Sequence, residues 1–314
     1  MEWYYILLII LAVLLLTIFI TTYICFRLTF YVDRKKDKNK EEFDIPPGDI
    51  YEPYRDQMIA WMKEARNMKH VEYKIISFDN LKLHAKYYEI EKGNTIEIMF
   101  HGYRGNAERD LCGGIQRAFA LKHNVLLVDQ RTSGDSEGNV ITFGINESKD
   151  CLKWIDLVVN EFGENQKIIL TGISMGAATV VTTAGYDLPN NVVGVLADCG
   201  YSTSKDIIKK CIGMLKLPPV IFYPFVKLGA KVFGHFNLEE TSPLEAVKKT
   251  KLPIIFFHGD TDDFVPHYMS EELCNAKKDN CKLITIKGAG HGLGFLVDPS
   301  LYIKSMEEFF YGEN

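Results

Sequence analysis

The stretch TGISMGAAT, residues 171–179, decides the interpretation of this chain, because the same letters fit three kinds of structure. Ser174 between Gly172 and Gly176 can be a nucleophile on a sharp turn, part of a glycine-rich nucleotide loop, or a site of tight backbone packing. The preceding KIIL is typical of a buried strand, and the following MGAATVVTTAG begins with small residues and predicts a helix. A serine on a strand-to-helix turn is the setting that the nucleophile pattern G-x-S-x-G requires.

The two glycines have a physical reason to flank this serine. A side chain held in a strained turn needs neighbours without Cβ atoms where strand and helix crowd together. The helix that begins at Met175 would also direct its free N–H groups and the positive end of its dipole toward a developing oxyanion.

The nucleotide-loop interpretation has some support. TGISMGAA is similar to the TGxxxGxG loop of short-chain dehydrogenases, and YSTSK (201–205) and YPFVK (223–227) match YxxxK. However, Ala178 replaces the last glycine, the loop lies mid-chain rather than after the first strand, and Pro224 is awkward inside a catalytic helix. These departures favour the nucleophile.

A nucleophile of this type requires an acid and then a histidine later in the chain, each in a loop after a strand. KLPIIFFHGDTDDFVP (251–266) ends a predicted strand in a loop with Asp260, Asp262 and Asp263. KLITIKGAGHGLG (282–294) ends the next strand in a loop that carries His291. The order Ser, Asp, His is therefore present.

The surrounding pattern predicts an α/β fold. From Val71 onward, a hairpin turning at Asn80 is followed by apolar strands that alternate with helical segments, which predicts a mostly parallel sheet covered by helices on both faces. Residues 202–250 interrupt the alternation with a long apolar interval, which we expect to be a helical cap.

On these motifs the chain resembles the α/β-hydrolases of the serine aminopeptidase-like or monoglyceride-lipase-like group over residues 71–312. HGDTDDFVP (258–266) matches that group's HGxxDxxVP stretch and places Asp262 in the acid position. FHGYRGN (100–106) matches its HG stretch, which implies that the backbone N–H of Tyr103, together with that of Met175, forms an oxyanion hole. DQRTSGDSEG (129–138) resembles its DxRGxGxSxG loop, with Thr132 in place of a glycine.

The resulting mechanistic expectation is an acyl-enzyme. His291 takes the proton of Ser174 as the hydroxyl attacks a carbonyl, Asp262 orients the imidazole, and water later releases the acyl group. His101 and His258 are expected to organise their loops. For Arg104 two roles stay open, an exposed ion pair or steering of an anionic substrate group.

The N-terminal segment predicts a retained transmembrane anchor. Trp3 to Phe26 carries no charge and is long enough to span a bilayer, and Arg27 and Arg34 to Lys40 follow it while no basic side chain precedes it. We therefore expect a single-pass protein with its body in the cytoplasm. The expected domains are an anchor (1–26), a juxtamembrane linker and helix (27–70), and a hydrolase domain (71–314).

Composition excludes some functions. A net charge of −5 gives no broad positive field, which argues against nucleic-acid binding. The seven cysteines are scattered without CxxC spacing, so we expect reduced thiols, and no motif calls for a metal or cofactor.

The sequence therefore favours a membrane-anchored serine hydrolase of carboxylic esters, since the apolar cap suits a hydrophobic acyl group. Serine aminopeptidase or thioesterase activity uses the same chemistry, and a non-catalytic membrane-tethered scaffold is the alternative of a different class.

Overall fold

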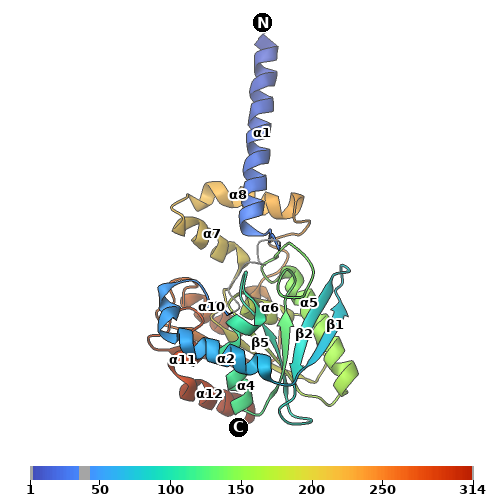
Figure 1. Cartoon of the computed structure of the whole chain (residues 1–314). Coiled ribbons are helices and arrows are strands. Elements are labelled where there is room, and N and C mark those ends of the chain that lie inside the picture. The colour runs from blue at the N-terminus through green and yellow to red at the C-terminus, as the bar shows by residue number, and fades with distance from the viewer. Residues whose placement is uncertain (1–2, 35–42, 313–314) are drawn as a thin grey trace.

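A computed structural model describes residues 3–34 and 43–312, and its body is the α/β fold expected from the sequence (Figure 1). One sheet has the strand order β1-β2-β4-β3-β5-β6-β7-β8. Pairing is antiparallel for β1 with β2 and β2 with β4, and parallel elsewhere. The strands are β1 (Val71–Ile76), β2 (Lys82–Tyr88), β3 (Ile96–Phe100), β4 (Asn124–Asp129), β5 (Ile168–Ile173), β6 (Val192–Asp198), β7 (Ile254–Gly259) and β8 (Cys281–Ile286).

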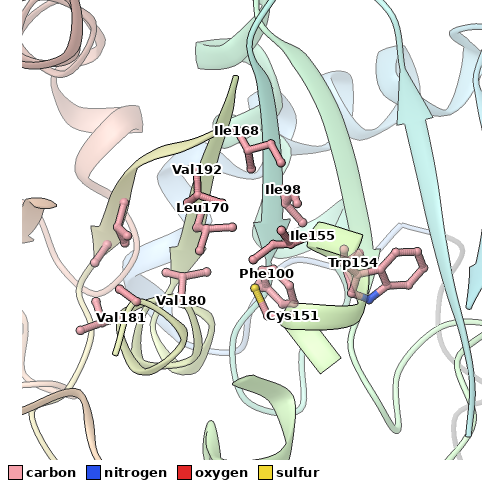
Figure 2. Close-up of a cluster of buried hydrophobic side chains, with 14 of the residues drawn as sticks. Ile98, Phe100, Cys151, Trp154, Ile155, Ile168, Leu170, Val180, Val181 and Val192 are labelled. Carbon is pink, nitrogen blue, oxygen red and sulfur yellow. The ribbon is translucent and has the colours of Figure 1, made fainter. Parts of the chain in front are cut away.

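The central strands are buried on both faces, as their continuous apolar sequences require. Alternate residues of β5 show this: Ile168 and Leu170 join one core cluster, and Ile169 between them joins the cluster on the other face. On the first face the sheet packs against α5 (Ile145–Phe162), α6 (Met175–Thr183) and α10 (Tyr268–Lys277), as Figure 2 shows for Trp154 and Val180. The other face is covered by α2 (Arg55–Asn67), α3 (Ala107–Asp110), α4 (Cys112–Ala120), α11 (Gly294–Val297) and α12 (Pro299–Tyr311).

The apolar interval forms a cap, as expected. It contains α7 (Ser204–Met214) and α8 (Pro219–Val232), whereas the short α9 (Pro243–Val247) that ends the interval packs on the core beside the sheet. A long helix, α1 (Trp3–Thr29), stands out from the body, and α8 lies across its base (Figure 1). By length and composition α1 is the one described helix that could cross a membrane.

Part of the expected juxtamembrane linker and helix, residues 27–70, packs on the body. Tyr51, in the 3-10 helix η2 (Asp49–Tyr54), and Met58 and Met62 of α2 are buried against the sheet. The charged and proline-rich composition around Tyr51 suggested a solvated linker, whereas the expected helix is α2, whose apolar residues recur on one face and cover the core. The basic residues Lys35 to Lys40 lie outside the described residues.

A second correction concerns the cysteines. Cys274, in the last part of α10, and Cys281, at the start of β8, form a disulfide with their Cα atoms 5.8 Å apart. No spacing pattern in the chain indicates this pairing, because it depends on how helix and strand meet. The other five cysteines are free thiols.

Candidate active site

Ser174 lies on a strained turn between β5 and α6. Its φ is 55° and its ψ is −116°, a backbone conformation that residues other than glycine seldom adopt. A Cβ at Gly172 would overlap the backbone of Gly176, and a Cβ at Gly176 would overlap the carbonyl of Phe100 on β3. The close packing of the glycines is thus what allows the turn, so the tight packing and the sharp turn at Ser174 are features of one structure.

The structure brings the three predicted residues into one hydrogen-bonded chain. His291 Nε2 lies 2.9 Å from Ser174 Oγ, and His291 Nδ1 lies 2.7 Å from Asp262 Oδ2. Ser174 follows β5, Asp262 follows β7 and His291 follows β8, so parallel strands place all three at the same edge of the sheet. An imidazole in this position can take the serine proton while the carboxylate faces its other nitrogen.

Asp262 is built to stay ionised. Its Oδ1 accepts the backbone N–H groups of Phe264 at 2.9 Å and Val265 at 2.8 Å, and its Oδ2 lies 3.3 Å from His258 Nε2. Burial raises the pKa of this carboxyl, but the hydrogen bonds from the two histidines and the backbone outweigh burial and hold the pKa well below its usual range. A permanent negative charge therefore faces His291.

The two neighbouring acids are placed differently. Asp260 Oδ1 accepts the Gly288 N–H at 2.6 Å, which ties the two loops together. Asp263 is exposed, and its carbonyl accepts the Lys210 ammonium. Of these aspartates in the described chain, Asp262 is the one that contacts His291.

The predicted oxyanion donors lie beside the serine. An added Cβ at Gly102 would be 3.6 Å from Ser174 Cβ, so the loop that carries Tyr103 adjoins the hydroxyl. Among the described residues, neither the Tyr103 nor the Met175 N–H has a protein acceptor. Asp110 Oδ2 accepts the Gly102 N–H at 3.0 Å and so fixes the start of this loop.

His101 and His258 organise loops, as expected. The ring of His101 accepts the N–H of Gln130 through Nε2, and the Gln130 amide donates to the His101 carbonyl at 2.6 Å. His258 Nε2 lies 2.9 Å from the Val265 carbonyl and its Nδ1 lies 2.7 Å from Ser270 Oγ, which holds the acid loop.

Two contacts from the N-terminal part of the chain were not predicted. The Tyr51 hydroxyl donates to the His291 carbonyl at 2.9 Å and so fixes the backbone of the histidine loop. Among the described residues Arg104 has no carboxylate partner, and its guanidinium donates to the carbonyls of Leu28, in α1, and Tyr31, just after α1. Such contacts join residues far apart in sequence, and no local pattern indicates them.

An apolar cluster adjoins the serine. The cluster that contains Met175 also includes Tyr201, cap residues such as Ile208 and Tyr223, and Phe30 after α1. The Tyr103 ring packs 5.1 Å from the ring of Phe143 in the same cluster. The end of α1 and the cap therefore enclose one side of the site together.

Within residues 3–34 and 43–312, two groups of side chains come close enough to hold a metal ion, but their chemistry does not favour one. The first group is Cys199, Asp262 and His291. The two ring nitrogens of His291 already face Ser174 and Asp262, which leaves neither for a metal. Burial raises the pKa of the Cys199 thiol, which disfavours the thiolate that a metal would require. In the second, His84 with Asp129 and Asp135, the hydrogen bond that the His84 ring donates to Asp129 raises the pKa of His84 and so favours the protonated imidazole over a ligand.

Comparison with known proteins defines the class. The chain is a serine hydrolase of the α/β-hydrolase fold, of esterase or peptidase type, which confirms the expected fold. It belongs to the prolyl oligopeptidase family, whose model matches residues 142–311.

Relatives and solved structures extend this result. The chain is 28% identical over 222 residues to the Bacillus subtilis uncharacterized protein YqkD, covering 70% of this chain and 72% of that protein. It is 26% identical over 173 residues to protein bem46 of Schizosaccharomyces pombe, covering 54% and 52%.

Among solved structures, the Pyrococcus furiosus esterase Pf2001 superposes with a TM-score of 0.63 at 22% identity, over 78% of this chain and 93% of that one. The Pyrococcus horikoshii acylaminoacyl peptidase superposes with a TM-score of 0.55 at 18% identity, over 79% and 42%. At these identities the superpositions establish the fold alone.

Proposed function

We propose that this protein is a membrane-anchored serine hydrolase that cleaves carboxylic esters of hydrophobic acyl groups. The observation that carries the proposal is the hydrogen-bonded chain from Ser174 Oγ through His291 to Asp262. The apolar cluster beside the serine supports a hydrophobic acyl group, because apolar side chains next to the nucleophile can pack against an alkyl chain.

The proposed mechanism has two steps. His291 Nε2 accepts the Ser174 proton as Oγ attacks the ester carbonyl, the N–H groups of Tyr103 and Met175 bind the oxyanion, and the alcohol leaves with the proton from His291. Water then attacks the acyl-enzyme by the same route, His291 accepts its proton, and the acid leaves as Ser174 is regenerated. Asp262 keeps the proton of the neutral imidazole on Nδ1 and stabilises the imidazolium that forms in each step.

A peptidase is the second candidate, because the family is named for oligopeptidases and one structural neighbour is an acylaminoacyl peptidase. The test measures turnover by the full chain in nanodiscs of short-chain and long-chain p-nitrophenyl esters, an acyl thioester, and aminoacyl p-nitroanilides with free and acylated amino groups. We expect the long-chain ester to have the highest kcat/KM, with all turnover lost in Ser174→Ala. A preference for an anilide would replace the ester proposal with a peptidase. No turnover by the folded wild type would favour the non-catalytic scaffold.

We also infer that α1 is the anchor and that the body lies in the cytoplasm, which the basic residues after the span support. The Cys274–Cys281 disulfide is a feature more common in oxidising compartments, so the orientation needs a direct test. In intact cells, an impermeant maleimide should fail to label a cysteine placed at Glu164, an exposed residue of the body. Ready labelling would reverse the orientation.

A further inference from the structure

The outward face of α8 is an exposed apolar surface that the proposed reaction does not use. Val220 is 82% exposed and Ile221 58% exposed, and Pro224, Leu228 and Val232 continue the same face at helical spacing. Before α8, residues 213–218 are all exposed, and they include Met214 and Leu215 at 54% and 69%. A surface of this size and kind marks an interaction site.

The position of this surface relative to α1 indicates what covers it. α8 crosses the base of α1 (Figure 1), where an added Cβ at Gly229 would lie 3.0 Å from both Phe26 Cβ and the Thr22 carbonyl. The ring of Phe233, just after α8, packs 5.3 Å from Tyr23 and 5.7 Å from Phe26. The two helices are thus held together, with α8 at a fixed level along α1.

The free length of α1 matches a bilayer. The residues from Trp3 to Ile20 are almost all exposed, and burial begins only at the crossing, where Thr22 is 2% exposed. These eighteen residues rise about 27 Å at 1.5 Å each, which is close to the roughly 30 Å of a bilayer's hydrocarbon core. When α1 spans the membrane, the outer face of α8 therefore reaches the boundary between acyl chains and headgroups.

The charge of the cap fits the same partner. Between Ser204 and Val232 the chain has six lysines and one aspartate, although the whole chain has a net charge of −5. Lys216 lies in the exposed stretch before α8 and Lys231 on its exposed side, and Lys227 on the same side is paired with Glu239. Apolar side chains beside lysines on one helix face are typical of a helix that lies in the membrane interface.

We propose that the surface formed by residues 213–218 and the outward face of α8 docks on the lipid bilayer that α1 spans, with anionic headgroups paired to its lysines. The proposal rests on α1 being the anchor. The inner face of α8 contributes Tyr223 and Val226 to the cluster that contains Met175. The cap therefore lies between the membrane surface and Ser174, and an acyl chain leaving the bilayer would meet it first.

The test uses the full chain in nanodiscs of phosphatidylcholine and phosphatidylglycerol. Cys25 and Cys211, the two partly exposed free thiols, are replaced by alanine, and a bimane label is placed at Val220→Cys. Leu11→Cys, in the middle of α1, reports on the anchor. Glu164→Cys, in the loop before β5 and at the opposite end of the parallel strands from Ser174, reports on the body away from the cap. Doxyl-labelled lipid quenches a probe that contacts acyl chains.

We expect strong quenching at positions 11 and 220, with quenching at 220 at least about twofold above that at 164. Quenching at 11 with equal, weak quenching at 220 and 164 would overturn the docking surface and leave the anchor intact. Absence of quenching at 11 would overturn the anchor, and the docking proposal with it, while the proposed ester hydrolysis would be tested separately by turnover.

Discussion

Replacing Asp262 with asparagine should nearly abolish turnover, and the hydrogen bonds of the carboxylate show why. Oδ1 accepts two backbone N–H groups, so the amide oxygen of asparagine must take that position. The amide NH₂ then replaces Oδ2, which lies 2.7 Å from His291 Nδ1. An NH₂ donor there requires Nδ1 to be an acceptor, so the imidazole proton moves to Nε2.

That tautomer directs an N–H at Ser174 Oγ, and His291 can no longer accept the serine proton. Rotating the amide does not help, because its NH₂ would then face the two backbone N–H groups. In the Ser-His-Asp template the same change costs about 10⁴-fold in kcat, through the wrong tautomer. We expect a loss of that order, about 5.5 kcal/mol of transition-state stabilisation at 1.36 kcal/mol per tenfold.

The assay is kcat for the best p-nitrophenyl ester, with Asp260→Asn and Asp263→Asn as matched controls. Asparagine at 260 retains an oxygen for the Gly288 N–H, and Asp263 is exposed, so each control should retain activity within about tenfold. An Asp262→Asn enzyme with more than a tenth of wild-type kcat would refute this reasoning. So would an equal loss in all three variants.

Three further predictions concern the support of the site. Tyr51→Phe leaves the His291 carbonyl without its donor and should cost about 1 kcal/mol of stability and up to about tenfold in kcat. The hydroxyl of Tyr54 has no partner among the described residues, so Tyr54→Phe should change neither quantity. Thermal melts and ester kinetics measure both. Gly176→Ala should yield little folded protein, because the new Cβ would overlap the backbone of β3. Gly213→Ala, at an open helical position, should express normally. Equal yields of soluble protein would contradict the tight packing inferred at Gly176. Because the pKa of Asp262 is lower in the folded protein than the ordinary carboxyl value of about 3.9, the ionised group stabilises the fold above that pH. In urea titrations, the difference in unfolding free energy between wild type and Asp262→Asn should therefore be constant above about pH 5 and shrink as pH falls below 4. A difference that grows in acid would contradict this prediction.

The fold and the site geometry differ in how far sequence could predict them. Ser174, Asp262 and His291 each lie in a short motif after an apolar strand, so local patterns were enough to find them and parallel strand direction was enough to place them together. The sheet was predictable for the same reason, since strands buried on both faces have continuous apolar sequences.

Other features depend on where distant segments meet. The acceptor of Tyr51 lies 240 residues away, and the charged, proline-rich stretch around it suggested a linker instead. The role of Arg104 follows from the point at which α1 ends above it. The Cys274–Cys281 pair follows from the way α10 meets β8. None of these leaves a periodic or spaced signal in the chain.

The most direct test of the central claim is to label the full chain with a fluorophosphonate and map the adduct by peptide mass spectrometry, with Ser174→Ala beside the wild type. We expect one adduct, on Ser174, in the wild type, and none in a Ser174→Ala variant that melts at the same temperature. A folded wild type that stays unlabelled, or an adduct on another serine that survives in Ser174→Ala, would contradict it.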